Sequence, residues 1–158
     1  MAQSILLLKT VVKTKMKIWQ WLSYLGLIPF VACLWLFNIS INGTSNDLLF
    51  DPQQAFLFYS SIILSFLAGA LWRKDTLNQH ITMQIFSNFL CLYAFFCLFI
   101  PTFFALIFLP IGYLSLFLVE YILCKNKEHG YTQSYFAMRL VLSVLVILLH
   151  ATALMSWF

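Results

Sequence analysis

The segment from Thr102 to Cys124 reads TFFALIFLPIGYLSLFLVEYILC, and Glu120 is the one charged residue in this otherwise apolar run. A membrane-spanning helix needs about 20 predominantly apolar residues, each adding about 1.5 Å of length, and this segment meets that requirement. A second segment of the same kind, from Ser134 to Trp157, follows after a short polar connection. Two consecutive segments that can each cross a bilayer indicate an integral membrane protein.

The rest of the chain has the same character. Hydrophobic residues make up 63% of its 158 positions and charged residues 9%, far outside the range of soluble globular domains. Three further apolar stretches precede the two already named, so the expected spans cover about residues 18–37, 54–72, 83–100, 102–124 and 134–157. We therefore predict a single all-α membrane domain over residues 1–158, a bundle of five transmembrane helices with no room for a soluble domain.

Positive charge is concentrated beside the apolar stretches. Eight of the nine Lys and Arg residues lie before the first stretch, after the second, or between the fourth and the fifth: Lys9, Lys13, Lys15, Lys17, Arg73, Lys74, Lys125 and Lys127. Cytoplasmic loops of membrane proteins carry an excess of Lys and Arg. The pattern predicts a multi-pass protein with a cytoplasmic N-terminus and a C-terminus on the outer side.

The segment before the first span has a helical charge pattern. Lys9, Lys13 and Lys17 repeat every four residues along one face of a helix, and apolar side chains gather toward another face: Ile5, Leu8, Val12 and Met16. This is the pattern of a short amphipathic helix that lies in the membrane interface and contacts anionic lipid headgroups. The alternative is that these lysines act only as topological signals.

Two charged residues fall inside predicted spans, Glu120 and Arg139. A charge in the hydrocarbon costs about 2.5–3.5 kcal/mol on insertion scales, so such residues need partners. Both lie equally far along the sequence from the centre of the connection between the last two spans, and antiparallel packing would place them at the same depth. We expect an ion pair between them; the alternative is that each side chain reaches the cytoplasmic headgroups separately.

Other polar residues form stripes along the predicted helices. Arg139, Ser143 and His150 lie near one face of the last span, and two earlier spans carry Gln84, Ser87, Asn88 and Cys91, and Ser61, Ser65 and Gly69. These side chains could line a narrow polar cavity open to the cytoplasm. The alternative is that they hydrogen-bond across helix interfaces and allow close packing. His150 is correspondingly either a proton carrier or a packing residue.

Three short motifs resemble a known family: LGLIPF at 25–30, ILSFLAG at 63–69 followed by Trp72, and YFAMRL at 135–140. They are similar to small bacterial membrane proteins related to human transmembrane protein sixty-nine, a family that carries a domain-of-unknown-function label. The resemblance implies recurrent positions but no reaction, and these positions are Gly26, Pro29, Ser65, Gly69, Trp72 and Arg139. A bacterial inner membrane is the expected location, because a mitochondrial precursor should carry an Arg-rich presequence.

The sequence contains no motif for nucleotide, metal, nucleophilic catalysis or nucleic acid, and the four cysteines lack metal or redox spacing. We therefore expect no cofactor and no enzymatic activity. Small size and small-residue faces favour an accessory, assembly or scaffold module of a larger membrane complex, in contact with lipids and with a protein partner or a second copy. The alternative is a module that binds or transports a lipid, a quinone or a small anion in a polar cavity lined by Ser65, Gln84, Asn88, Glu120, Arg139 and Ser143.

Overall fold

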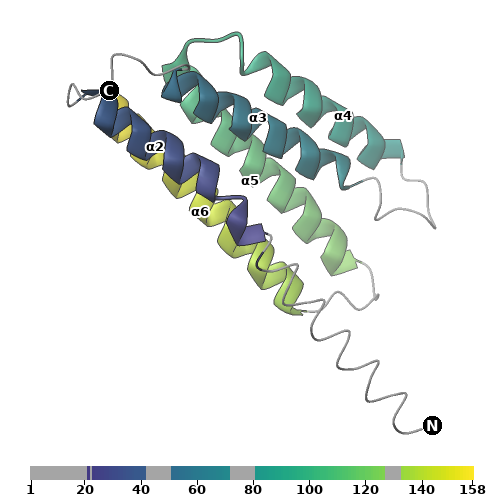
Figure 1. The fold of residues 1–158 in the computed structure, drawn as a ribbon. Coiled ribbons are helices and arrows are strands. Elements are labelled where there is room, and N and C mark those ends of the chain that lie inside the picture. The colour runs from purple at the N-terminus through teal and green to yellow at the C-terminus, as the bar shows by residue number, and fades with distance from the viewer. Residues whose placement is uncertain (1–20, 22, 42–50, 72–80, 127–132) are drawn as a thin grey trace, which may run out of the picture.

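The computed structural model describes residues 21, 23–41, 51–71, 81–126 and 133–158. Within these ranges the chain forms five α-helices and no strand (Figure 1): α2 (Ile28–Ile41), α3 (Pro52–Gly69), α4 (Ile81–Phe96), α5 (Thr102–Asn126) and α6 (Gln133–Trp157). The predicted all-α class is confirmed for this part of the chain. The predicted interfacial helix before residue 18 lies outside the described residues, as do Trp72, Arg73 and Lys74.

The first predicted span differs most from the helix that the structure forms. A helical turn ends at Leu25, a non-helical turn covers Gly26 and Leu27, and α2 begins at Ile28 and extends to Ile41, beyond the predicted end at residue 37. Pro29 explains the interruption, because it has no N–H to donate to the carbonyl of Leu25. The freed backbone is partly satisfied by α3, since the Tyr59 hydroxyl donates a hydrogen bond of 2.8 Å to the carbonyl of Gly26.

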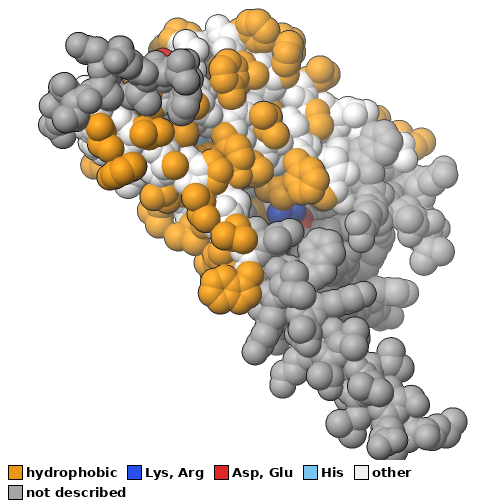
Figure 2. All heavy atoms as spheres, in the orientation of Figure 1, with side chains coloured by type: hydrophobic (Ala, Val, Ile, Leu, Met, Phe, Trp, Pro, Cys, Tyr) orange, Lys and Arg blue, Asp and Glu red, His pale blue; other side chains and the backbone are white. Residues whose placement is uncertain are grey.

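Three helical segments among the described residues are long and apolar enough to cross a membrane. They are Ser23–Ser40, Thr102–Ile122 and Ala137–Trp157, and a shorter apolar stretch covers Met83–Phe96 in α4. Large apolar side chains are exposed over every described helix, and Figure 2 shows them spread across one face of the molecule. This surface is typical of a membrane protein. The count of five spans stays a prediction.

Helix α3 has the central position in the bundle. It packs against α2, α4 and α5, while α6 packs against α5 and α2, and α4 also contacts α5. Figure 1 shows α2 and α6 side by side and α4 at the opposite edge. Apolar side chains from all five described helices fill the interior, and the largest fully buried ones are Phe30, Phe56, Leu64, Leu106, Leu109, Tyr113 and Leu116.

Side chains of α3 and α4 pack closely against α5 at Gly112. A Cβ atom at this position would lie 2.6 Å from Cδ2 of Leu64 on α3 and 3.0 Å from Cε1 of Tyr93 on α4. The Tyr93 ring is held in place, because its hydroxyl donates a hydrogen bond of 2.7 Å to the carbonyl of Phe108. Pro110 lies inside α5, which continues through it. Glycine at position 112 therefore permits the close approach of three helices.

Substitution of Gly112 by Ala is expected to destabilise the bundle. The added methyl group must displace packed atoms of Leu64 or Tyr93, at a cost of about 1–3 kcal/mol that exceeds the helix-propensity gain of about 1 kcal/mol. We predict that Gly112→Ala lowers the free energy of unfolding by up to about 2 kcal/mol, measured by unfolding in mixed micelles with a denaturing detergent. Gly69→Ala is the matched control, because a Cβ atom there meets nothing within 4 Å. Equal stability of the two variants would contradict the packing at Gly112.

Candidate functional site

The most deeply buried polar contacts join three helices around His150. The Nε2 atom of His150 on α6 lies 2.9 Å from the Ser60 hydroxyl on α3, and its Nδ1 atom lies 2.8 Å from the carbonyl of Val146. The Tyr113 hydroxyl on α5 donates a hydrogen bond of 2.8 Å to the carbonyl of Ser60. Ser60 is 0% exposed and His150 is 1% exposed. We call Ser60, Tyr113 and His150 the polar node.

The geometry of the polar node assigns a role to each ring nitrogen of His150. A backbone carbonyl only accepts hydrogen bonds, so Nδ1 carries the proton that is donated to Val146. In a neutral imidazole Nε2 is then the acceptor, and the Ser60 hydroxyl donates to it. The Tyr113 hydroxyl donates to the Ser60 carbonyl. Each donor in the polar node therefore meets an acceptor, and the node is satisfied without any charge.

Aromatic rings enclose the histidine. The ring centroid of His150 lies 4.9 Å from that of Phe56, 5.8 Å from that of Phe30 and 6.1 Å from that of Tyr113. The Trp157 ring packs edge-on against Phe56 at 5.4 Å, which extends the apolar enclosure by two turns along α6. A dry aromatic enclosure strengthens the hydrogen bonds within it and keeps solvent out.

The structure brings Glu120 and Arg139 together, as their matched spacing predicts. The Nε atom of Arg139 on α6 lies 3.2 Å from Oε2 of Glu120 on α5. The Glu120 side chain is 2% exposed and the Arg139 side chain 11% exposed. Both residues lie roughly 27 Å along their helices from the ends that carry Thr102 and Trp157, at 1.5 Å per residue. The ion pair therefore fixes the depth of α5 against α6.

Small residues join α3 to α4. The Ser87 hydroxyl donates a hydrogen bond of 2.7 Å to the carbonyl of Ala68, and the Cys91 thiol donates one of 3.6 Å to the carbonyl of Ser65. Ala68 and Ser87 are buried in this interface between α3 and α4. Ser61 is also buried, and its hydroxyl has no hydrogen-bond partner among the described residues. In the interface between α3 and α4, polar side chains of α4 thus bind backbone carbonyls of α3.

The predicted cavity residues do not gather at one interior site. Ser65, Gln84 and Ser143 are half-buried, Asn88 is exposed on the surface of α4, and Gly69 is exposed at the end of α3. The expectation for Asn88 is wrong, because Ser87 is the residue of this pair that faces α3. One position along a helix rotates a side chain by about 100°. Glu120 with Arg139, and His150 with Ser60, are the polar pairs that the structure assembles.

Three polar residues of the interior have no counterpart in the sequence prediction, namely Ser60, Tyr59 and Tyr113. Ser60 is adjacent to the predicted polar stripe of Ser61 and Ser65. The sequence therefore indicated this part of the helix, but it did not indicate that the side chain of Ser60 faces the interior. The cysteines with described side chains are free thiols, with Cys33 and Cys97 buried and Cys91 half-buried. Within the described ranges, no three His, Cys, Asp or Glu side chains lie close enough to hold a metal ion.

Removal of the Ser60 hydroxyl is expected to destabilise the fold more than removal of the neighbouring hydroxyl. Ser60→Ala leaves Nε2 of buried His150 without a donor, which we predict costs about 1–2 kcal/mol of unfolding free energy. Ser61→Ala is the matched control and is predicted to change stability by less than about 0.5 kcal/mol, since it removes no hydrogen bond. Both values come from the same unfolding titration. A larger loss for Ser61→Ala would show that the buried hydroxyls are assigned the wrong roles.

The comparisons with known proteins identify a family but no activity. No curated protein and no solved structure matches the chain. The family model described as "Protein of unknown function (DUF3429)" matches residues 15–155, which is most of the chain. Its matched range takes in α2 to α5, α6 up to residue 155, the polar node and the Glu120–Arg139 pair. The chain belongs to the DUF3429 family of proteins of unknown function.

Proposed function

We propose that this chain is an accessory, assembly or scaffold module of a larger membrane complex. In this proposal it spans a bacterial inner membrane five times, with the N-terminus in the cytoplasm and the C-terminus outside. The observation that carries the proposal is the use of the interior polar side chains. Ser60 bonds to His150, and Glu120 pairs with Arg139, each across a helix interface. Such groups stabilise a helix arrangement and leave the outer surface for contacts with other molecules.

An enzymatic role is outside this proposal, although one pair of residues has a suggestive geometry. A serine hydroxyl at 2.9 Å from a histidine nitrogen matches the spacing of a nucleophile and its base. Ser60 is 0% exposed, however, and the histidine is enclosed by aromatic rings. A nucleophile must reach a substrate carbon, and a hydroxyl without exposed surface cannot do so. The pair is therefore assigned a structural role.

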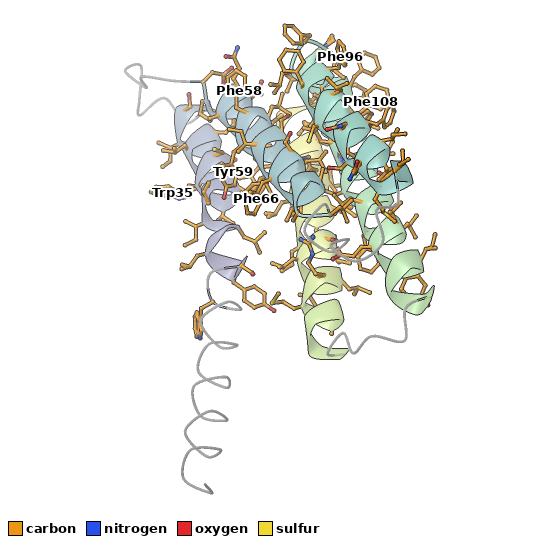
Figure 3. The ribbon with its side chains drawn as sticks, turned by 90° about the vertical axis from the view of Figure 1, so that its right-hand side faces the viewer. Trp35, Phe58, Tyr59, Phe66, Phe96 and Phe108 are labelled. Carbon is orange, nitrogen blue, oxygen red and sulfur yellow. The ribbon has the colours of Figure 1, made fainter. Side chains whose placement is uncertain are left out.

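The outer surface supports lateral contacts within the membrane. Exposed large apolar side chains occur on all five described helices, and several are aromatic: Trp35, Phe58, Phe66, Phe96 and Phe108. Figure 3 shows these side chains projecting from α2, α3, α4 and α5 rather than into the bundle. A small protein with little described surface outside its helices can interact mainly through such faces. An assembly or scaffold role uses this surface directly.

The relation to human transmembrane protein sixty-nine is also part of the proposal, supported by the three sequence motifs. Two of the motif positions have defined contacts. The carbonyl of Gly26 accepts the hydrogen bond from Tyr59 at the interruption before α2, and Arg139 forms the ion pair with Glu120. Related chains would need both features to keep α2 against α3 and α5 against α6.

A second candidate is a module that binds a lipid, a quinone or a small anion. One observation favours it: the Arg139 side chain keeps 11% of its surface exposed while Glu120 keeps 2%. In Figure 2 one blue patch, with red beside it, is visible among the hydrophobic side chains. A guanidinium at this position has further N–H groups that an anionic headgroup could accept from.

Gentle purification from the native membrane, followed by mass spectrometry of everything that remains bound, tests the proposal. We predict a protein partner in a stoichiometric amount. The partner is expected to remain bound in the double variant Glu120→Gln with Arg139→Gln, which removes both charges and buries no lone carboxylate.

A lipid or quinone that is retained by the unmodified chain and lost in the double variant, with no protein partner in either sample, would contradict the scaffold proposal. That result would establish the second candidate. Circular dichroism of each sample is the control for folding.

A further inference from the structure

An exposed asparagine lies in the middle of the apolar surface of α4. Ile81, Ile85, Leu92 and Phe95 surround Asn88 along this face, and all of them are exposed. Asn88 lies roughly 10 Å along the helix from Ile81, at 1.5 Å per residue, well inside the apolar stretch that begins at Met83. In the proposed five-span arrangement, this side-chain amide projects from the bundle into hydrocarbon.

The amide of Asn88 makes no hydrogen bond to any residue that the structure describes. Other exposed polar side chains do so locally: Asn38 donates to the carbonyl of Leu34 at 3.0 Å, and Thr152 donates to the carbonyl of Leu149 at 2.9 Å. These local bonds satisfy a polar group within its own helix. An amide without a partner in hydrocarbon costs several kcal/mol, and a partner on another molecule would remove this cost at Asn88.

The spacing along this face is that of a helix-packing seam. Residues 81, 85, 88, 92 and 95 of α4 follow steps of four, three, four and three, which is a heptad pattern. The members are Ile81, Ile85, Asn88, Leu92 and Phe95, and we call them the α4 seam. Each member is exposed. In soluble coiled coils a single asparagine within such a seam fixes the register and the number of strands.

We infer that the α4 seam is the contact between two copies of this chain, paired through Asn88. Two copies inserted in the membrane with the same orientation place every residue at the same depth as its equivalent. An asparagine amide both donates and accepts, so it is complementary to itself across a two-fold axis. A lipid tail offers neither donor nor acceptor, and an unrelated partner would need a polar group at this one depth.

The position of α4 in the bundle is compatible with this contact. Helix α4 packs against α3 and α5, and Figure 1 shows it at the edge of the bundle, away from α2 and α6. Ser87 and Cys91 face α3, and the α4 seam lies about 100° further round the helix, on a different face. The inference rests on the proposed function, since it names one of the lateral contacts that a scaffold needs.

The test measures self-association in lipid vesicles. Donor-labelled and acceptor-labelled full-length chains are reconstituted at decreasing protein-to-lipid ratios, and energy transfer gives the dissociation constant. We expect Asn88→Leu to weaken association about tenfold, the size of an interhelical hydrogen bond in a membrane. Asn88→Gln keeps the amide and is expected to retain most of the association. Asn38→Leu is the matched control, because it removes an exposed amide that already bonds to its own helix.

Two results would overturn the inference. One is an unmodified chain that stays monomeric at every density, and the other is an Asn88→Leu variant that associates as strongly as the unmodified chain. Leucine suits a lipid-facing position, so loss of folding is not expected to obscure the measurement. If the chain is monomeric in vesicles but still retains a protein partner on purification, this inference fails and the proposed function stands.

Discussion

Inside a bilayer no water is available to satisfy a polar side chain, and each such group must find its partner within protein. The arrangement of the described helices follows from this constraint. Ser60, Tyr113 and His150 join α3, α5 and α6 at one depth, and Glu120 with Arg139 joins α5 to α6 at another. Two polar contacts at different depths prevent α5 from sliding or rotating against α6. Apolar contacts alone specify register weakly in lipid.

The same constraint fits the composition of α3, which is not among the helices that are long and apolar enough to cross a membrane alone. Helix α3 contains Gln53, Ser60 and Ser61, and it packs against three other helices. Much of its polar content therefore faces protein rather than lipid. Helices α2, α5 and α6 carry the segments that are long and apolar enough to span independently.

The helical class and the approximate helix positions could be predicted because apolar length is a local property. The pair of Glu120 and Arg139 could be predicted too, because a short connection forces α5 and α6 to pack antiparallel at matched depth. The partner of His150 could not, since Ser60 lies 90 positions away and the contact depends on how α3 sits between α5 and α6. Asn88 was assigned to the interior because a stripe on an isolated helix does not reveal which face meets its neighbour.

The central claim is that the polar node is a closed, uncharged contact that holds three helices together. Nitrogen NMR of His150 in lipid tests it most directly, in a chain whose other histidines, His80 and His129, are replaced by glutamine. The account predicts a neutral ring with the proton on Nδ1, an unprotonated Nε2 that accepts a hydrogen bond, and slow exchange of the Nδ1 proton with water. A charged ring, a proton on Nε2, or rapid exchange with water would contradict the claim and would indicate an interior open to water.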